Sequence, residues 1–193
     1  MNKPCVLNKS PNMPHRLFIA VPVAPDLRNR ITRWEADHKD LPVQWLDSKD
    51  LHITIVPPWQ DEKPEEIIKR LETFASPSFM KPATIDMVSA GPTRFNPRLI
   101  WGLGHTTPDL LKLRTEVEHV LSFEPDKRPF KLHLTLARFA PTFNVPFGIR
   151  KLNEHVTWTQ PLDRLALYET LLTPEGVTYR ILTEVSCSHL PSI

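Results

Sequence analysis

The sequence predicts an α+β fold of two pseudo-symmetric lobes, each an antiparallel sheet with outer helices, with an active-site groove between them. Two observations support this prediction. Short strand segments, many of them in pairs, alternate with amphipathic helices along the chain, and one short motif occurs once in each half. With 193 residues, 40% of them apolar, the chain is long enough to bury a core.

The first strand is predicted at 16–23, an apolar run that ends near Pro22. A helix follows over 26–39, because apolar residues recur at spacings of four and three and Asp26 stands in a capping position. The later elements are predicted by the same criteria. Strands are expected at 43–46, 51–56, 83–91, 98–104 and 132–139, helices at 62–75, 108–121 and 146–154, and a closing hairpin at 162–172 and 177–185 with its turn at 174–176.

The ends of the chain and its composition exclude several classes of protein. We expect residues 1–15 to form a flexible tail before a single domain at 16–193, since they are polar and lack the apolar stretch of a signal peptide or membrane helix. Cys5 and Cys187 form no C-x-x-C motif and no metal-ligand spacing. The sequence therefore predicts a cytoplasmic, monomeric protein without membrane association, metal or cofactor.

The net charge limits how nucleic acid could bind. Twenty-four basic and 22 acidic residues leave a formal charge of +2. This excess is too small for a protein that holds nucleic acid by charge alone, so any contact with nucleic acid must be local.

One pattern occurs twice in predicted strands, as Leu-His-Ile-Thr-Ile at 51–55 and as Leu-His-Leu-Thr-Leu at 132–136. Because strand side chains alternate between faces, the His and Thr of each motif share one face and the apolar residues line the other. The alternative is that these are two half-exposed strands whose polar faces happen to carry histidine. Two further His-x-Thr sequences, at His105 in a predicted turn and at His155 at a predicted helix end, lack the strand context and are interpreted as chance.

Two histidines and two threonines suit the hydrolysis of a cyclic phosphodiester. One imidazole can accept a proton from the attacking water while the other protonates the departing ribose oxygen, without a metal. The hydroxyls of Thr54 and Thr135 can donate to the phosphate oxygens as negative charge grows there. Arg138 is a candidate for the cation at this phosphate, although strict alternation places it opposite His133 unless a bulge redirects it.

At these residues the sequence resembles the two-histidine phosphoesterases, and among them the LigT-like RNA 2′,3′-cyclic phosphodiesterases and 2′-5′ RNA ligases. The similarity extends over most of the chain, from the opening strand at 16–23 to the closing hairpin. The resemblance implies an enzyme that converts 2′,3′-cyclic phosphate ends of RNA to 2′-phosphates, with reversible 2′-5′ RNA ligation as a possible second activity. It also implies that His52 is the acid on the 3′ oxygen, that His133 is the base on water, and that the phosphate is held by three residues: Thr54, Thr135 and Arg138.

Two positions depart from the family pattern. Val56-Pro57-Pro58-Trp59 follows the first motif where many relatives carry a basic residue and a glycine-ending loop, and Leu132 stands where proline is common. Neither departure removes a catalytic group. Phe18 is a weaker candidate for stacking on the RNA base, because the opening strand borders the groove in the family that the chain resembles.

Other functions remain open from the sequence. The same residues could act on ADP-ribose 1″,2″-cyclic phosphate or on 2′-5′-linked oligonucleotides. A non-catalytic RNA-binding module is a further alternative, and the intact His and Thr of both motifs argue against it.

Overall fold

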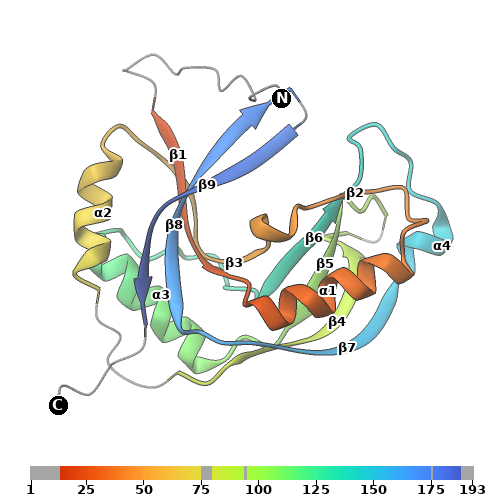
Figure 1. Cartoon of the computed structure of the whole chain (residues 1–193), viewed down its shortest axis with the longest axis horizontal. Coiled ribbons are helices and arrows are strands. Elements are labelled where there is room, and N and C mark those ends of the chain that lie inside the picture. The colour runs from red at the N-terminus through yellow and green to blue at the C-terminus, as the bar shows by residue number, and fades with distance from the viewer. Residues whose placement is uncertain (1–13, 75–79, 94, 175, 188–193) are drawn as a thin grey trace.

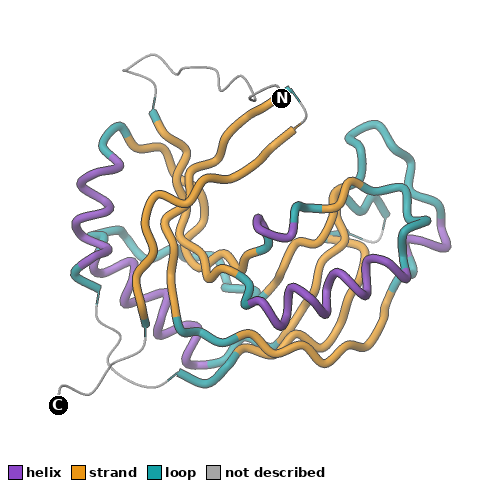
Figure 2. The backbone as a smooth tube through the Cα atoms, viewed as in Figure 1, coloured by secondary structure: helices purple, strands orange, loops and turns teal. Residues whose placement is uncertain are grey.

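The computed structural model describes residues 14–74, 80–93, 95–174 and 176–187. The chain folds into two antiparallel sheets that lie side by side as two lobes, with helices packed against them (Figures 1 and 2). This arrangement confirms the predicted α+β class. The first 13 residues of the predicted tail, and Glu175 of the predicted hairpin turn, lie outside the described residues.

The first lobe is built on a four-stranded sheet in the order β3-β1-β8-β9. Its strands are β1 (His15–Pro22), β3 (His52–Asp61), β8 (Arg164–Thr173) and β9 (Gly176–Ser186). Helix α2 (Pro64–Glu72) contacts β9 and helix α3 (Pro108–Val120) contacts β3. Both helices therefore cover the side of this sheet that faces away from the second lobe (Figure 1).

The second lobe is built on a five-stranded sheet in the order β2-β6-β5-β4-β7. Its strands are β2 (Gln44–Trp45), β4 (Ala83–Gly91), β5 (Leu99–Gly104), β6 (His133–Arg138) and β7 (Asn153–Gln160). Helix α1 (Pro25–Asp37) packs against β7 and the short helix α4 (Phe147–Arg150) contacts β4.

One region differs from the prediction. The helix expected at 146–154 is limited to Phe147–Arg150, and the chain then enters strand β7, which the sequence analysis missed. His155 therefore lies in a strand, and its predicted place at a helix end is wrong. The reason is that β7 is a sheet edge made mostly of polar residues, and its apolar residues are limited to Val156 and the buried Trp158.

The two lobes meet along the motif strands. β3 and β6 contact each other, and one continuous apolar core contains residues from both, such as Ile53 and Leu134. Consecutive strands β2 and β3 belong to different sheets, joined by a single 3-10 turn (Ser48–Asp50). The chain therefore crosses between lobes directly before the first motif, which places this motif at the lobe boundary.

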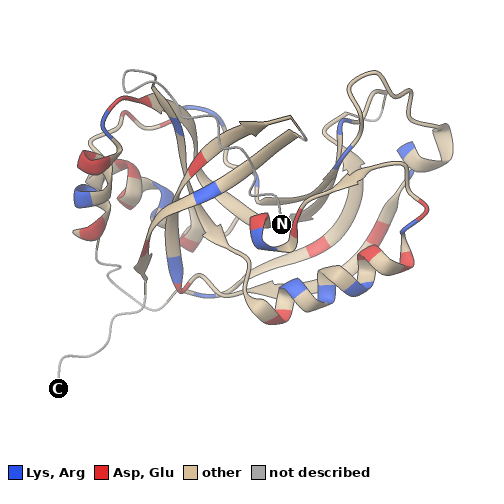
Figure 3. Ribbon diagram, turned by 45° about the horizontal axis from the view of Figure 1, so that its top comes forward, with Lys and Arg blue, Asp and Glu red and all other residues tan. Residues whose placement is uncertain are grey.

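Charged residues of both signs are interspersed over both lobes (Figure 3), in keeping with the small net charge of the sequence. Among the described residues, no helix is long and apolar enough to cross a membrane.

Candidate active site

The two predicted motifs occupy equivalent places at the starts of β3 and β6. His52 and Thr54 are half-buried on one face of β3, while Ile53 and Ile55 are buried on the other. The same alternation holds in β6, where His133 and Thr135 are half-buried and Leu134 and Leu136 are fully buried. The apolar residues fix each strand in the core, so the polar pair of each motif has a defined orientation.

Both imidazoles are anchored in the same way. His52 Nδ1 lies 2.6 Å from the carbonyl oxygen of Asp50, and His133 Nδ1 lies 2.8 Å from the carbonyl oxygen of Lys131. A carbonyl can only accept, so Nδ1 carries the proton in each ring and Nε2 of a neutral ring is left as the acceptor. Within the described residues neither Nε2 has a hydrogen-bond partner, and each is available to exchange a proton with substrate.

Each motif strand also bulges one residue after its threonine. In β3 the pairing partner of Ala20 is Thr54 and that of Ile19 is Val56, so Ile55 is the extra residue. In β6 the partners of Trp101 and Ile100 are Thr135 and Ala137, so Leu136 is the extra residue. A bulge restarts the alternation of side chains, and in β6 the residue five positions after the histidine comes to the face of the histidine.

This bulge settles the orientation of Arg138. Arg138 pairs with Leu99 and Thr135 pairs with Trp101, and since Leu99 and Trp101 share one face of β5, so do Arg138 and Thr135. The guanidinium Nη2 donates to the hydroxyl of Tyr179 on β9, at 3.1 Å. Arg138 therefore reaches from the second lobe to the first, on the motif face. The equivalent position after the first motif is Pro57, which carries no charge.

His52 is enclosed by aromatic rings of the first sheet. Its ring centroid lies 4.9 Å from that of Phe18, 5.3 Å from that of Tyr168 and 5.0 Å from that of Tyr179. This enclosure corrects one prediction. Phe18 is only 2% exposed and stacks on Tyr168 in a small buried cluster, so it supports His52 and offers no face to an RNA base.

The enclosure changes the acidity of the His52 imidazole. Burial lowers its pKa to about 4, and the nearby positive charges of Arg138 and of a protonated His133 act in the same direction. The hydrogen bond to the Asp50 carbonyl opposes this shift but does not cancel it. In the free protein His52 is therefore neutral at pH 7. Both Arg138 and His133 are close enough to act on the His52 ring, so the two motifs and Arg138 lie near one another.

The surroundings of His133 are different. Its ring meets the edge of Trp101 with centroids 5.6 Å apart, and the Lys131 ammonium lies 4.4 Å from the Trp101 ring centroid. The hydroxyls of Thr54 and Thr135 have no hydrogen-bond partner among the described residues, so both are free to donate to a bound phosphate.

The carboxyl of Asp50 links His52 to the closing hairpin. Asp50 is 7% exposed and its Oδ2 accepts a hydrogen bond from the Thr178 hydroxyl on β9, at 3.0 Å. Burial raises the pKa of this carboxyl. The same residue supplies the carbonyl that anchors His52, and so a residue of the hairpin holds the segment that orients the first imidazole.

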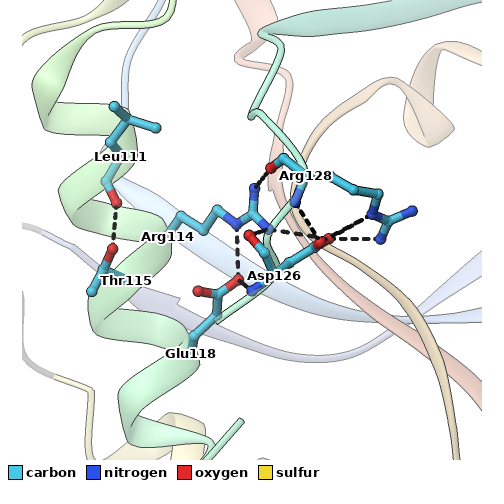
Figure 4. Close-up of polar contacts among 6 residues, drawn as sticks. All are labelled: Leu111, Arg114, Thr115, Glu118, Asp126 and Arg128. Atoms are coloured by element: carbon cyan, nitrogen blue, oxygen red, sulfur yellow. Dashed lines mark hydrogen bonds and ion pairs between the residues drawn. The ribbon is translucent and has the colours of Figure 1, made fainter. Parts of the chain in front are cut away.

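The segment before the second motif is fixed by a buried arginine of α3. Arg114 Nε donates to Glu118 at 2.8 Å, and its terminal nitrogens contact Asp126 and the carbonyl of Arg128 (Figure 4). Arg128 in turn pairs with Asp126, which lowers the pKa of that carboxyl. These contacts hold residues 126–128 against α3, a few residues before His133.

The remaining His-x-Thr sequences lie outside this site. His105 is almost fully exposed in the loop after β5, with its Nε2 3.3 Å from the carboxylate of Asp86. His155 shares a cross-strand row with His133, in the order His133, Leu103, Met87 and His155. Three strand spacings, about 14 Å, separate the two ends of that row, so His155 cannot contact the same phosphate as His133.

Several residues of the site were missed by the sequence analysis. They are Asp50, Trp101, Lys131, Tyr168 and Tyr179. The tyrosines come to His52 from the other end of the chain through sheet pairing, which no local pattern reveals. Lys131 did carry a signal, because it precedes His133 by two residues and could have been assigned to the same face.

The assembled groups can perform acid and base chemistry on a phosphate. Two imidazoles with free Nε2 atoms, two unpaired hydroxyls and one guanidinium converge from the two lobes. Among the described residues, no group of three or more His, Cys, Asp or Glu side chains is placed to hold a metal ion.

Known proteins resemble this chain in both sequence and structure. An RNA 2′,3′-cyclic phosphodiesterase of Aeropyrum pernix is 28% identical over 160 residues, covering 78% of this chain and 90% of the relative. One of Methanocaldococcus jannaschii is 24% identical over 181 residues, covering 88% and 99%. A crystal structure of a Thermus thermophilus protein matches with a TM-score of 0.67 at 22% identity, covering 89% of this chain and 97% of that one.

Escherichia coli LigT in complex with 3′-AMP has the same fold, with a TM-score of 0.62 at 20% identity over 91% of this chain and 99% of that one. The model of the 2′-5′ RNA ligase superfamily matches residues 23–173, which contain both motifs, both bulges and the arginine. This match spans most of the chain and, together with the relatives, shows that the protein belongs to the 2′-5′ RNA ligase superfamily, the LigT-like two-histidine phosphoesterases.

Proposed function

We propose that this protein hydrolyses the 2′,3′-cyclic phosphate at the 3′ end of RNA and leaves a 2′-phosphate. One observation carries the proposal. Two imidazoles with the same Nδ1 anchor and a free Nε2 enter one site from two lobes, together with two unpaired threonine hydroxyls and Arg138. The activity of the curated relatives, named as RNA 2′,3′-cyclic phosphodiesterases, supports this substrate.

We assign the two histidines to an in-line displacement at phosphorus. His133 Nε2 accepts a proton from water as the water oxygen bonds to phosphorus, and His52 Nε2 gives a proton to the ribose 3′ oxygen as the bond from phosphorus to that oxygen breaks. The phosphate stays on the 2′ oxygen. Thr54, Thr135 and Arg138 bind the non-bridging oxygens and stabilise the charge that develops on them.

For His52 to act as the acid, substrate binding must raise the pKa of its imidazole. In the free protein its pKa of about 4 leaves it neutral at pH 7. A bound phosphodiester carries a negative charge beside the ring, which favours the imidazolium and raises the pKa in the complex. The pH profile of kcat reports the pKa of His52 in the complex, and the profile of kcat/KM reports its pKa in the free enzyme. The fall in rate caused by deprotonation of His52 should therefore occur at higher pH in the kcat profile. A His52 limb near pH 4 in both profiles, with full activity at pH 7, would assign His52 as the base.

The direct test is hydrolysis of an oligoribonucleotide that ends in a 2′,3′-cyclic phosphate, in excess EDTA. Wild type is compared with His52→Ala, His133→Ala and the control His155→Ala, which removes an exposed histidine of the same sheet as His133. We expect a 2′-phosphate product, a loss of about 10²-fold or more in each motif variant, and no change in the control. If neither motif variant lowered the rate of hydrolysis, the proposal would be refuted.

Two substrates distinguish the related activities of the superfamily. ADP-ribose 1″,2″-cyclic phosphate and 2′-5′-linked oligonucleotides are assayed beside the RNA end under the same conditions. A higher kcat/KM for either would move the substrate assignment while keeping the same residues in the same roles. Ligation is the same displacement with a 5′-hydroxyl in place of water, and an RNA 5′-hydroxyl end added to the cyclic phosphate assays it.

A further inference from the structure

A second cation, Lys131, lies near His133. Lys131 precedes His133 by two residues, and its carbonyl accepts from His133 Nδ1. Its ammonium lies 4.4 Å from the centroid of the Trp101 ring, whose edge meets the His133 ring at a centroid distance of 5.6 Å. The ammonium and the His133 imidazole therefore border the same indole.

The indole gives this ammonium a defined place. Trp101 is only 8% exposed, and its Nε1 donates to the Ser89 hydroxyl at 3.0 Å. Its ring also lies against Gly91, where an added Cβ atom would collide with the indole. The hydrogen bond and the close backbone of Gly91 together fix the ring. The ammonium contacts one ring face, and its N–H groups that point away from the ring remain free to donate.

The charge of Lys131 is not neutralised. Within the described part of the chain no carboxylate lies within ion-pair distance of it. An exposed, unpaired ammonium held beside a half-buried imidazole is a ready partner for an anion.

Lys131 and Arg138 do not serve the same anion. Arg138 ends β6, five positions after His133, and Lys131 precedes the first residue of that strand by two positions. Arg138 extends toward Tyr179 of the first lobe, while Lys131 lies over Trp101 of the second sheet. A substrate whose reactive phosphate is held at the two histidines would therefore need a second phosphate to reach Lys131.

We propose that Lys131 binds the internucleotide phosphate directly 5′ of the terminal nucleotide. This inference rests on the proposed function and adds to it a binding residue for a second phosphate, which an RNA end has and a nucleoside cyclic phosphate lacks. A phosphate contact carries no base preference, so the discrimination is by chain length and not by sequence. Lys131 is thus a specificity-determining residue of the second lobe.

The test compares two substrates that differ by one phosphate. A dinucleotide ending in a 2′,3′-cyclic phosphate has one internucleotide phosphate, and the mononucleoside 2′,3′-cyclic phosphate has none. Lys131→Met should lower kcat/KM about 10-fold more for the dinucleotide than for the mononucleotide. Lys131→Arg should restore most of the loss, because it restores the positive charge.

A salt titration gives a second readout. Loss of one phosphate contact to a single strand should reduce the slope of log kcat/KM against log salt by about 0.7 for the dinucleotide only. The matched control is Lys151→Met, which removes an ammonium that lies 4.2 Å from the Phe147 ring centroid on α4. It should change neither substrate.

The outcomes separate this inference from the proposed function. Equal effects of Lys131→Met on both substrates, or no effect on either, would overturn the inference while the hydrolysis stands. If wild type turns over neither substrate, the proposed function fails, and titration with the dinucleotide and mononucleotide 2′-phosphates still tests Lys131. Weaker binding of the dinucleotide alone would support the subsite, and unchanged binding would overturn it.

Discussion

The two motif strands share one backbone design and differ in what surrounds it. In β3 and in β6 the histidine Nδ1 meets a carbonyl two residues earlier, and a bulge follows the threonine. Yet His52 lies among three aromatic rings, and His133 lies beside Trp101 of the second sheet. The repeated backbone sets where the two imidazoles stand, and the unrepeated side chains make them chemically different.

The difference extends to the flanking charges. Two residues before the histidine, the first lobe has the buried carboxyl of Asp50 and the second has the exposed ammonium of Lys131. Five residues after it, the first has Pro57 and the second has Arg138. All the positive charge at these positions therefore comes from the second lobe. The first lobe encloses a neutral imidazole, and the second supplies the charge that attracts a phosphate.

The largest expected effect concerns the enclosed histidine. The folded protein keeps His52 neutral down to about pH 4, whereas the unfolded chain takes up this proton near pH 6.5. The contribution of His52 to stability is therefore full above pH 6.5 and falls by up to about 3 kcal/mol as the pH drops toward 4. His52→Asn should flatten this fall in urea unfolding between pH 7 and 4.5. If this variant had the same pH dependence of stability as the wild type, the His52 imidazole would not be shielded from water in the folded protein.

Removing the cation of the second lobe should be next in size. Arg138→Met removes the guanidinium at the reactive phosphate, and kcat/KM should fall by roughly 10- to 100-fold for dinucleotide and mononucleotide alike. Arg138→Lys should recover part of this, because it keeps the charge but not the planar fork. The control Arg30→Met, at an exposed position of α1, should have no effect. A loss confined to the dinucleotide would place Arg138 away from the cyclic phosphate.

Variants of the two motif threonines test whether both lobes bind the phosphate oxygens in the transition state. Thr54→Val and Thr135→Val each remove one unpaired hydroxyl at nearly constant volume, and each should lower kcat by about 10-fold. The control Thr159→Val changes an exposed threonine of β7. A tenfold loss in one motif variant with none in the other would mean that only one lobe contacts the developing charge.

The smallest effect is expected at the hairpin. Thr178→Val removes the hydrogen bond to the buried carboxyl of Asp50 and should cost about 1–2 kcal/mol in the free energy of unfolding, because it leaves that carboxyl without this donor. It should also lower kcat, since Asp50 anchors His52. The equivalent control is Thr183→Val, farther along β9. Loss of stability with an unchanged kcat would separate the hairpin from the orientation of the imidazole.

The motifs and most elements of the fold could be predicted from the sequence because their signals are local. Alternation within five residues identified the motif strands, and the spacing of Leu27 and Ile31 identified α1. Strand β7 was missed because its side chains are mostly polar, and it is defined by pairing with β4 rather than by its own pattern. Phe18 was misassigned because a strand that borders a site has two faces, and sheet pairing decides what covers each.

Within the site, the non-local contacts were the ones that escaped prediction. Tyr168 and Tyr179 reach His52 through β1 and the hairpin, more than a hundred residues along the chain. The orientation of Arg138 depends on one unpaired residue, Leu136, that no periodicity marks. Lys131 was within reach of sequence reasoning, and it was overlooked because the strand was predicted to start one residue later.

The bulges have a consequence for recognising relatives by sequence. Leu136 adds one residue to the sequence between His133 and Arg138 but pairs with no residue of β5. The spacing in the sequence is therefore one residue longer than the spacing along the sheet. A chain without this residue would carry its arginine four positions after the histidine and still present it on the same face. A motif search should therefore accept either spacing, and should require two consecutive buried residues, such as Leu136 and Ala137, whenever the spacing is five.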